Sequence, residues 1–298
     1  MAEHAHHAHH HHQHAHGPAS TLQRAAALTV AFAVVEAAGG WWTGSLALLS
    51  DAGHMLTDGA ALALGAAAAW IARRPPSQRH SYGLGRIEVF AANLNAAAML
   101  AIAIAVAYEA FVRFKEPIAV NGGAAAVIAA VGLALNLAVM HWLSPHAHDM
   151  NARAARLHVI GDLLGSAAAL GAGAIIALTG WFPIDPIASL AICVLIGISS
   201  LRLLREGVHA LMEGVPQGLS VDVIGIEMAR IDGVRSVHDL HVWTLSGSRT
   251  ALSAHVVVVN LTDWHRVLAE LQMRLHEKFG IDHVTLQPES DTRPLKRL

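Results

Sequence analysis

The sequence has few charged residues, few aromatic side chains and a single cysteine. Charged residues occupy 14% of the 298 positions, whereas soluble domains contain about 25%, so an ordinary water-soluble protein is excluded. The one cysteine, Cys193, excludes a disulfide framework and a thiolate metal cluster. A nucleotide-binding loop of the G-x-x-x-x-G-K-[ST] type is also missing, which argues against an ATP-driven pump.

Alanine, glycine and leucine dominate, and 54% of the residues are hydrophobic. Small residues of this kind let transmembrane helices pack closely. A helix that spans a bilayer needs roughly 20 consecutive apolar residues. Six windows are long enough, at 24–44, 46–72, 88–112, 121–143, 155–180 and 183–204. We therefore predict a polytopic α-helical membrane domain with six transmembrane helices.

Basic residues indicate how these helices are oriented. Before the first window, between the second and third, between the fourth and fifth, and after the sixth, the chain has Arg24, Arg73, Arg74, Arg79, Arg86, Arg153, Arg156, Arg202 and Arg205. The opposite loops contain only Arg113 and Lys115. Cytoplasmic loops are enriched in Lys and Arg, so we predict that both termini are cytoplasmic. The sequence uses arginine far more often than lysine and is rich in alanine, which favours a bacterial cytoplasmic membrane. We expect no nucleic-acid partner.

From about residue 207 the chain changes to short alternating elements. The pattern predicts a helix from Ser220 to Ile231, strands at 234–244 and 250–259, a helix from Thr262 or Asp263 to Gly280, and a strand at 283–287. This α-β-β-α-β order predicts a small cytoplasmic α+β domain with helices on one face of the sheet. About 85 residues make a marginally stable domain, which favours contact with a second copy.

Two apolar windows carry the same pair of ionisable residues. His54 and Asp58 are four residues apart, and so are His158 and Asp162. Residues at i and i+4 share one face of a helix, and ionisable groups inside a membrane are rare unless they are paired, hydrated or bound. If the two helices pack together, two imidazoles and two carboxylates meet at one point.

Two nitrogens and two oxygens at tetrahedral corners suit Zn²⁺, and two carboxylates neutralise a divalent ion. Mg²⁺ or Ca²⁺ would require more oxygen ligands. Gly53, Gly59, Gly161 and Gly165 would let the two helices approach closely. The alternative for one pair alone is a local hydrogen bond, but the repeated spacing favours a metal. Of the other polar residues, Asp51 is expected near the extracytoplasmic mouth of the site, and Asn93, Asn95 and Asn136 are expected to bridge helices.

Four stretches of the chain resemble the cation diffusion facilitator family of metal–proton antiporters. They are S-L-A-L-L-S-D-A-G-H-M-L-T-D, R-H-S-Y-G-L-G-R-I-E, H-V-I-G-D-L-L-G-S and V-H-D-L-H-V-W-T-L-S, and the similarity covers residues 22 to 289. The resemblance implies six membrane helices with a cytoplasmic ferredoxin-like domain, a homodimer, and export of zinc from the cytoplasm. It places the transport site at His54, Asp58, His158 and Asp162, the version associated with zinc and sometimes cadmium.

The resemblance also implies two further sets of residues. A zinc-binding site at the dimer interface of the cytoplasmic domain would use His238 and His255, with Asp282 and Glu289 as additional matches. A charge lock at the cytoplasmic face of the dimer would use Arg86 and Glu213, and a solvated loop pair is its alternative.

These observations divide the chain into four segments: a disordered His-rich cytoplasmic tail (1–21), the transmembrane domain (22–206), the cytoplasmic metallochaperone-like domain (207–290) and a C-terminal tail (291–298). The first sixteen residues include nine His, interrupted by Ala and Gln unlike a purification tag, and we expect them to capture Zn²⁺ loosely.

Because metal ligands must be deprotonated, protons and Zn²⁺ compete for the same side chains, which predicts Zn²⁺/H⁺ exchange by a transporter that is not an enzyme. An intramembrane zinc hydrolase is the alternative, although catalytic zinc usually keeps an open position. A zinc sensor is another, although it would not explain six spans with buried ligands.

Overall fold

The computed structural model describes residues 18–143, 150–246 and 249–290, and the side chains of 24–142, 159–246 and 249–290. The His-rich tail up to residue 17 and the C-terminal tail from residue 291 therefore lie outside the described residues. The chain forms two compact units. One combines the chain up to Gly59 with Ala103–Val194, and the other combines Ala60–Ile102 with the chain from Leu195.

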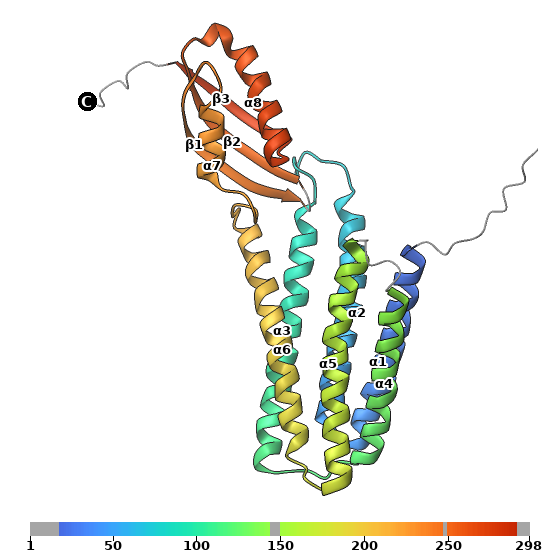
Figure 1. Cartoon of the computed structure of the whole chain (residues 1–298). Coiled ribbons are helices and arrows are strands. Elements are labelled where there is room, and N and C mark those ends of the chain that lie inside the picture. Colours follow the sequence, from blue (N-terminus) through green and yellow to red (C-terminus); the bar gives the residue numbers. More distant parts are fainter. Residues whose placement is uncertain (1–17, 144–149, 247–248, 291–298) are drawn as a thin grey trace, which may run out of the picture. The chain divides into compact units, whose positions relative to one another are not determined.

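Six long helices precede the cytoplasmic domain (Figure 1). They are α1 (Pro18–Thr43), α2 (Leu46–Ala72), α3 (Arg86–Lys115), α4 (Gly122–Leu143), α5 (Met150–Thr179) and α6 (Ile184–Leu211). Each contains a window that is long and apolar enough to cross a membrane. The predicted six-helix membrane domain is therefore confirmed, and the protein is an integral membrane protein.

Small residues bring α4 and α5 close together. A Cβ atom added at Gly173 of α5 would lie 2.7 Å from the backbone nitrogen of Ala126 in α4. Buried alanines from both helices, Ala125, Ala129 and Ala169, line the contact. In lipid such packing relies on van der Waals contact between closely spaced backbones, because the hydrophobic effect does not drive helices together there. The Ala- and Gly-rich composition is thus used for helix association.

The remaining elements form the cytoplasmic domain in the predicted order. They are α7 (Val221–Ala229), β1 (Val234–Ser246), β2 (Arg249–Val258), the short 3-10 helix η2 (Leu261–Asp263), α8 (Trp264–Phe279) and β3 (His283–Ser290). The sheet order is β1-β2-β3; β1 and β2 are antiparallel, and β2 and β3 are parallel. The predicted α-β-β-α-β arrangement is confirmed.

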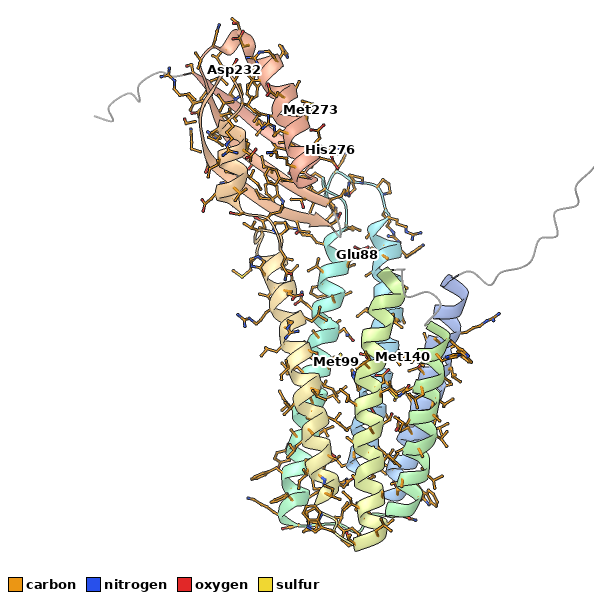
Figure 2. All side chains as sticks on the ribbon, in the orientation of Figure 1. Glu88, Met99, Met140, Asp232, Met273 and His276 are labelled. Atoms are coloured by element: carbon orange, nitrogen blue, oxygen red, sulfur yellow. The ribbon has the colours of Figure 1, made fainter. Side chains whose placement is uncertain are left out.

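One face of this sheet is covered by α7 and α8 (Figure 1). Leu271 and Leu275 of α8 are fully buried against Leu252 and Val256 of the central strand. Truncating a buried leucine to alanine costs about 2–5 kcal/mol, so these residues hold the domain together. The opposite side of α8 carries Met273, which is 54% exposed (Figure 2). The second sheet face carries His238, His255 and Glu289.

Helix boundaries were predicted less well than helix positions. Helix α1 begins at Pro18, inside the segment predicted as tail, since proline fits the first turn of a helix. Helix α6 continues to Leu211, past the boundary predicted after residue 206, because charged residues do not end a helix once it leaves the hydrocarbon region. The two caps were predicted correctly: the Ser220 side chain accepts a hydrogen bond from the Val223 amide, and Gly280 ends α8 with φ of 66°.

Candidate functional site

Helix α2 places His54 and Asp58 one turn apart on the same face. The distance from His54 Nδ1 to Asp58 Oδ2 is 3.7 Å, and both side chains are 18% exposed. The shared face follows directly from the spacing of four residues. The alternative of a simple local hydrogen bond does not describe this pair, because 3.7 Å exceeds hydrogen-bond length.

Asp162 of α5 lies against the same imidazole. Its Oδ1 atom is 3.7 Å from His54 Nε2, and its side chain is only 1% exposed. One ligand atom from each of His54, Asp58 and Asp162 lies within 4.8 Å of the others. Ligands of a tetrahedral zinc ion are about 3.4 Å apart for bonds of 2.0–2.2 Å, so a small contraction would bring these three atoms onto one ion.

The fourth predicted ligand is His158, a position of α5 whose side chain lies outside the described residues. Successive membrane spans alternate in direction, so α2 and α5 run antiparallel. Asp58 follows His54 by one turn of α2, and position 158 precedes Asp162 by one turn of α5. The backbone of α5 at position 158 is therefore at the level of Asp58.

Sequence reasoning missed a buried hydrogen-bonded chain beside this cluster. The Asn136 amide of α4 donates to the Ser166 hydroxyl of α5 at 3.2 Å, and that hydroxyl donates to Asp51 of α2 at 2.9 Å. Asp51 is fully buried. Ser166 could have been selected from the sequence, because it follows Asp162 by four residues and therefore lies on the same face of α5.

The glycine and asparagine predictions were only partly right. Gly165 does make room for α2, because an added Cβ would lie 2.2 Å from Asp51 Oδ1. Gly59 instead packs against Val30 of α1, since its place on α2 faces that neighbour. Asn136 bridges two helices as predicted, whereas Asn93 and Asn95 bond within their own helix, to the Val89 carbonyl and Met99 Sδ.

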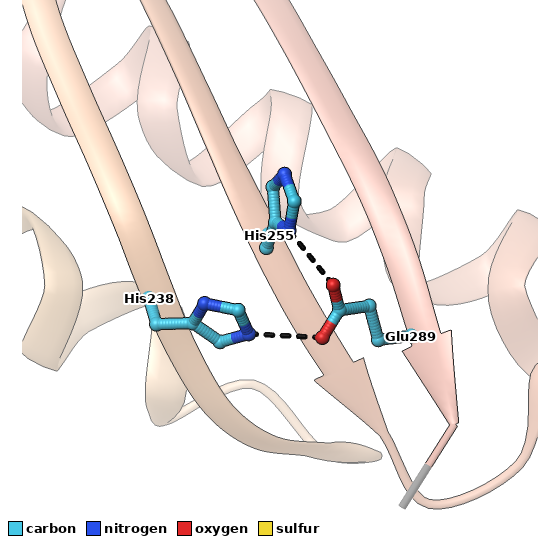
Figure 3. Close-up of side chains that lie close together, drawn as sticks. All are labelled: His238, His255 and Glu289. Carbon is cyan, nitrogen blue, oxygen red and sulfur yellow. Dashed lines mark hydrogen bonds and ion pairs between the residues drawn. The ribbon is translucent and has the colours of Figure 1, made fainter. Parts of the chain in front are cut away.

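A second cluster lies on the helix-free face of the cytoplasmic sheet. His238 and His255 are cross-strand partners on β1 and β2, and their neighbour on β3 is Glu289 (Figure 3). The Glu289 carboxylate accepts one hydrogen bond from His238 Nε2 at 2.9 Å and one from His255 Nδ1 at 2.7 Å. These three predicted ligands are brought together within one chain.

Two aspartates near this cluster differ from the prediction. Asp282 is not part of it and instead contacts His276 of α8, because it precedes β3 whereas Glu289 is near the end of that strand. Asp239, which sequence reasoning did not select, points its carboxylate between His255 (3.8 Å) and His241 (3.0 Å). Its φ of 50° and the bulge between His238 and His241 turn it toward the histidines.

Hydrogen bonds from His238 and then His255 lower the pKa of Glu289 below its ordinary value of 4.5. A lowered folded-state pKa contributes stability above the unfolded value, and this is lost as the pH falls through the folded value. In the metal-free full-length protein, we therefore expect β3 to lose protection from amide hydrogen exchange as the pH falls below 4.5. The Glu289→Gln variant should lack this transition. An identical pH dependence in wild type and variant would contradict the assignment.

The predicted charge pair of Arg86 and Glu213 is formed within one chain. Arg86 Nη2 is 3.0 Å from Glu213 Oε1, and the two side chains are 41% and 64% exposed. A pair this exposed contributes at most about 1 kcal/mol. Its effect on stability is therefore small.

Each of the two parts of the chain matches a known protein family. Residues 22–212 match the family described as the cation efflux transmembrane domain. Residues 216–291 match the family described as the cation efflux protein, cytoplasmic domain.

Several curated relatives match nearly the whole chain. The zinc transporter ZitB of Escherichia coli strain K12 is 42% identical over 96% of this chain and 92% of its own. The cadmium, cobalt and zinc/H(+)-K(+) antiporter of Bacillus subtilis is 36% identical over 87% of this chain and 85% of its own. A solved structure, the metal-bound C-terminal domain of the CzcD transporter from Cupriavidus metallidurans, is 36% identical, covers 24% of this chain and 99% of that domain, and has a TM-score of 0.23. The chain therefore belongs to the cation diffusion facilitator family of cation efflux proteins, whose members are metal transporters and not enzymes.

Proposed function

We propose that this protein exports Zn²⁺ from the cytoplasm in exchange for protons. The observation that carries the proposal is the convergence of His54, Asp58 and Asp162 in otherwise apolar helices. Together with His158 they offer two nitrogens and two carboxylates, a set that suits tetrahedral zinc. The filled site would be neutral, so its ion could cross the hydrocarbon region without a large electrostatic cost. The name of ZitB as a zinc transporter supports this metal.

Proton exchange follows from the chemistry of the ligands. Imidazole binds a metal only when neutral, and carboxylate only when ionised. A site that faces near-neutral cytoplasm is ready for Zn²⁺, whereas a site that faces a more acidic exterior gains protons and releases the ion. Alternating exposure of one site to the two sides is the usual principle of secondary transporters. The printed name of the Bacillus subtilis relative, which includes H(+) exchange, supports the same coupling.

The remaining assignments complete the proposal. We place both termini in the cytoplasm, on the basis of the arginine-rich loops. The resemblance to its family and its bacterial relatives support a homodimer in a bacterial cytoplasmic membrane. The segments 1–21, 22–206, 207–290 and 291–298 serve as tail, transport domain, cytoplasmic domain and C-terminal tail. His238, His255 and Glu289 form a regulatory zinc site. Arg86 and Glu213 form a charge lock at the cytoplasmic face of the dimer.

Transport in proteoliposomes tests the function. The purified full-length protein is reconstituted with a zinc-sensitive dye inside the vesicles, and an acidic lumen is set against a neutral exterior. We expect zinc to accumulate inside against its own gradient, and we expect a proton ionophore to abolish the accumulation. Zinc flux that follows only the zinc gradient, whatever the pH difference, would indicate a channel-like uniporter instead.

A further inference from the structure

The buried hydrogen-bonded chain of Asn136, Ser166 and Asp51 joins three helices. It runs from the Asn136 amide through the Ser166 hydroxyl to the Asp51 carboxylate, with distances of 3.2 Å and 2.9 Å. The exposed fractions of the three residues are 2%, 0% and 0%. A carboxylate buried among apolar helices is costly and is retained where it has a specific use. None of the three residues belongs to the ligand set.

Gly165 shows how tightly α2 and α5 meet at this level. A Cβ added there would lie 2.2 Å from Asp51 Oδ1, so the Asp51 carboxylate would have to move. The hydroxyl of the next residue, Ser166, then holds the same carboxylate by its other oxygen, Oδ2. Helix α2 therefore packs against α5 at this level and is also hydrogen-bonded to it.

This contact lies on one side of the metal cluster. Asp51 precedes His54 by three residues, and Ser166 follows Asp162 by four residues on an antiparallel helix. The chain is thus about one turn from the ligands, toward the loop that joins α1 to α2. Within the cluster itself, His54 and Asp58 are 18% exposed and Asp162 is 1% exposed. These hydrogen bonds close the space between α2 and α5 toward the α1–α2 loop.

We propose that Asp51, Ser166 and Asn136 are the closure of the metal site on the side of the α1–α2 loop. They act as positioning residues, because they hold α2 against α5 and do not bind the ion. This inference rests on the proposed transport function, in which α2 and α5 must part on that side to release zinc. Individual hydrogen bonds make a modest net contribution to stability, so such a closure can hold the site shut and still open in each cycle.

The chain carries a native reporter of this opening. Cys193 of α6 is the only cysteine in the sequence, and it is buried. Its Sγ atom is 4.0 Å from the hydroxyl of Ser50, the residue before Asp51 on α2. If α2 moves away at this level, Cys193 loses its cover and becomes accessible to a thiol reagent from that side.

The test compares Ser166→Ala with Ser189→Ala. Ser189 is a matched control, because it is also fully buried in a membrane helix and its hydroxyl bonds only to the carbonyl of Asp185 in its own helix. Spheroplasts that contain the full-length protein are treated from outside with a membrane-impermeant maleimide, and modification of Cys193 is followed by mass spectrometry. Ser166→Ala loses both hydrogen bonds of the Ser166 hydroxyl. We expect it to be modified at least about tenfold faster, which corresponds to a loss of about 1.4 kcal/mol. Ser189→Ala should match the wild type.

A second measurement separates closure from general loosening. In proteoliposomes without a pH difference, Ser166→Ala should leak zinc about tenfold faster than wild type, whereas its equilibrium zinc affinity should be unchanged. Asn136→Ala is a second variant, to be used if Ser166→Ala fails to fold. We expect the same faster labelling and the same faster leak from it. Unchanged labelling and unchanged leak in a folded variant would overturn the proposal. So would a fall in zinc affinity that accounts for the altered flux.

Labelling also keeps this inference distinguishable from the proposed function. If the wild type moves no zinc under any pH difference, the transport proposal fails. Cys193 labelling still reports the closure in that case, because it requires no transport. Faster labelling of Ser166→Ala would then show that these residues cover a binding site that does not transport zinc. Unchanged labelling would overturn the closure proposal as well.

Discussion

The Asp162→Asn variant is expected to lose zinc transport, with zinc affinity at the membrane site reduced by at least about 100-fold. Loss of a partner outside the ligand shell alone costs about 10–100-fold in metal affinity, and Asp162 is placed as a ligand. Its carboxylate is 1% exposed and 3.7 Å from His54 Nε2, so water cannot easily replace it. The amide keeps the shape but removes one of the two negative charges that balance Zn²⁺.

Zinc affinity is measured by isothermal titration of the full-length protein in detergent. The titration is done in a His238→Ala background, so that the cytoplasmic cluster does not dominate the signal. Ser189→Ala is the control, because Ser189 is also a buried polar residue of a membrane helix but lies outside the cluster. It should keep wild-type affinity. A folded Asp162→Asn protein with wild-type zinc affinity would place the metal elsewhere.

The membrane site shows which features a sequence can specify. His54 and Asp58 share a face because helix periodicity fixes the relation of residues four apart. The meeting with Asp162 was inferred from the repetition of the same pair in another apolar segment. The link between Asp51 and Ser166 could not be inferred in this way, because its partners are single polar residues on different helices. Only the helix rotations decide whether such residues form hydrogen bonds with each other or, like Asn93, with a carbonyl of their own helix.

The cytoplasmic cluster shows a similar limit. Alternation along β1 and β2 predicts that His238 and His255 face the same side, and the antiparallel register sets them opposite each other. Asp282 and Glu289 are seven positions apart on extended chain, which is about 23 Å, so one chain cannot bring both to the same ion. The turn of Asp239 toward the histidines depends on a bulge, a local irregularity that residue patterns do not reveal.

A different buried carboxylate determines the start of the site-bearing helix α2. Asp185, at the beginning of α6, accepts hydrogen bonds from the Ser45 hydroxyl at 2.6 Å and from the Leu46 amide at 2.6 Å. It also accepts one from the Ala47 amide at 3.3 Å. The first amides of a helix have no partner within the helix, and the helix dipole favours a negative charge at this end. Asp185 therefore caps the first two amides of α2, while the Ser45 hydroxyl, just before the helix, accepts from the Leu48 amide.

Asp185→Ala is expected to lower the free energy of unfolding by about 3–5 kcal/mol, because three hydrogen bonds are lost and each one to a charged group contributes about 1.5–3 kcal/mol. Three donors at the end of α2 would be left in an apolar environment, where they cannot turn to water. Asp185→Asn should cost less, because its side-chain oxygen still accepts from one amide. Unfolding is followed in detergent through the reaction of buried Cys193 with a thiol dye, with Ser189→Ala as the control. Equal stability of Asp185→Ala and Ser189→Ala would show that α2 is held by packing alone. The ligand pair His54 and Asp58 would then owe its position to the helix contacts rather than to the capped end.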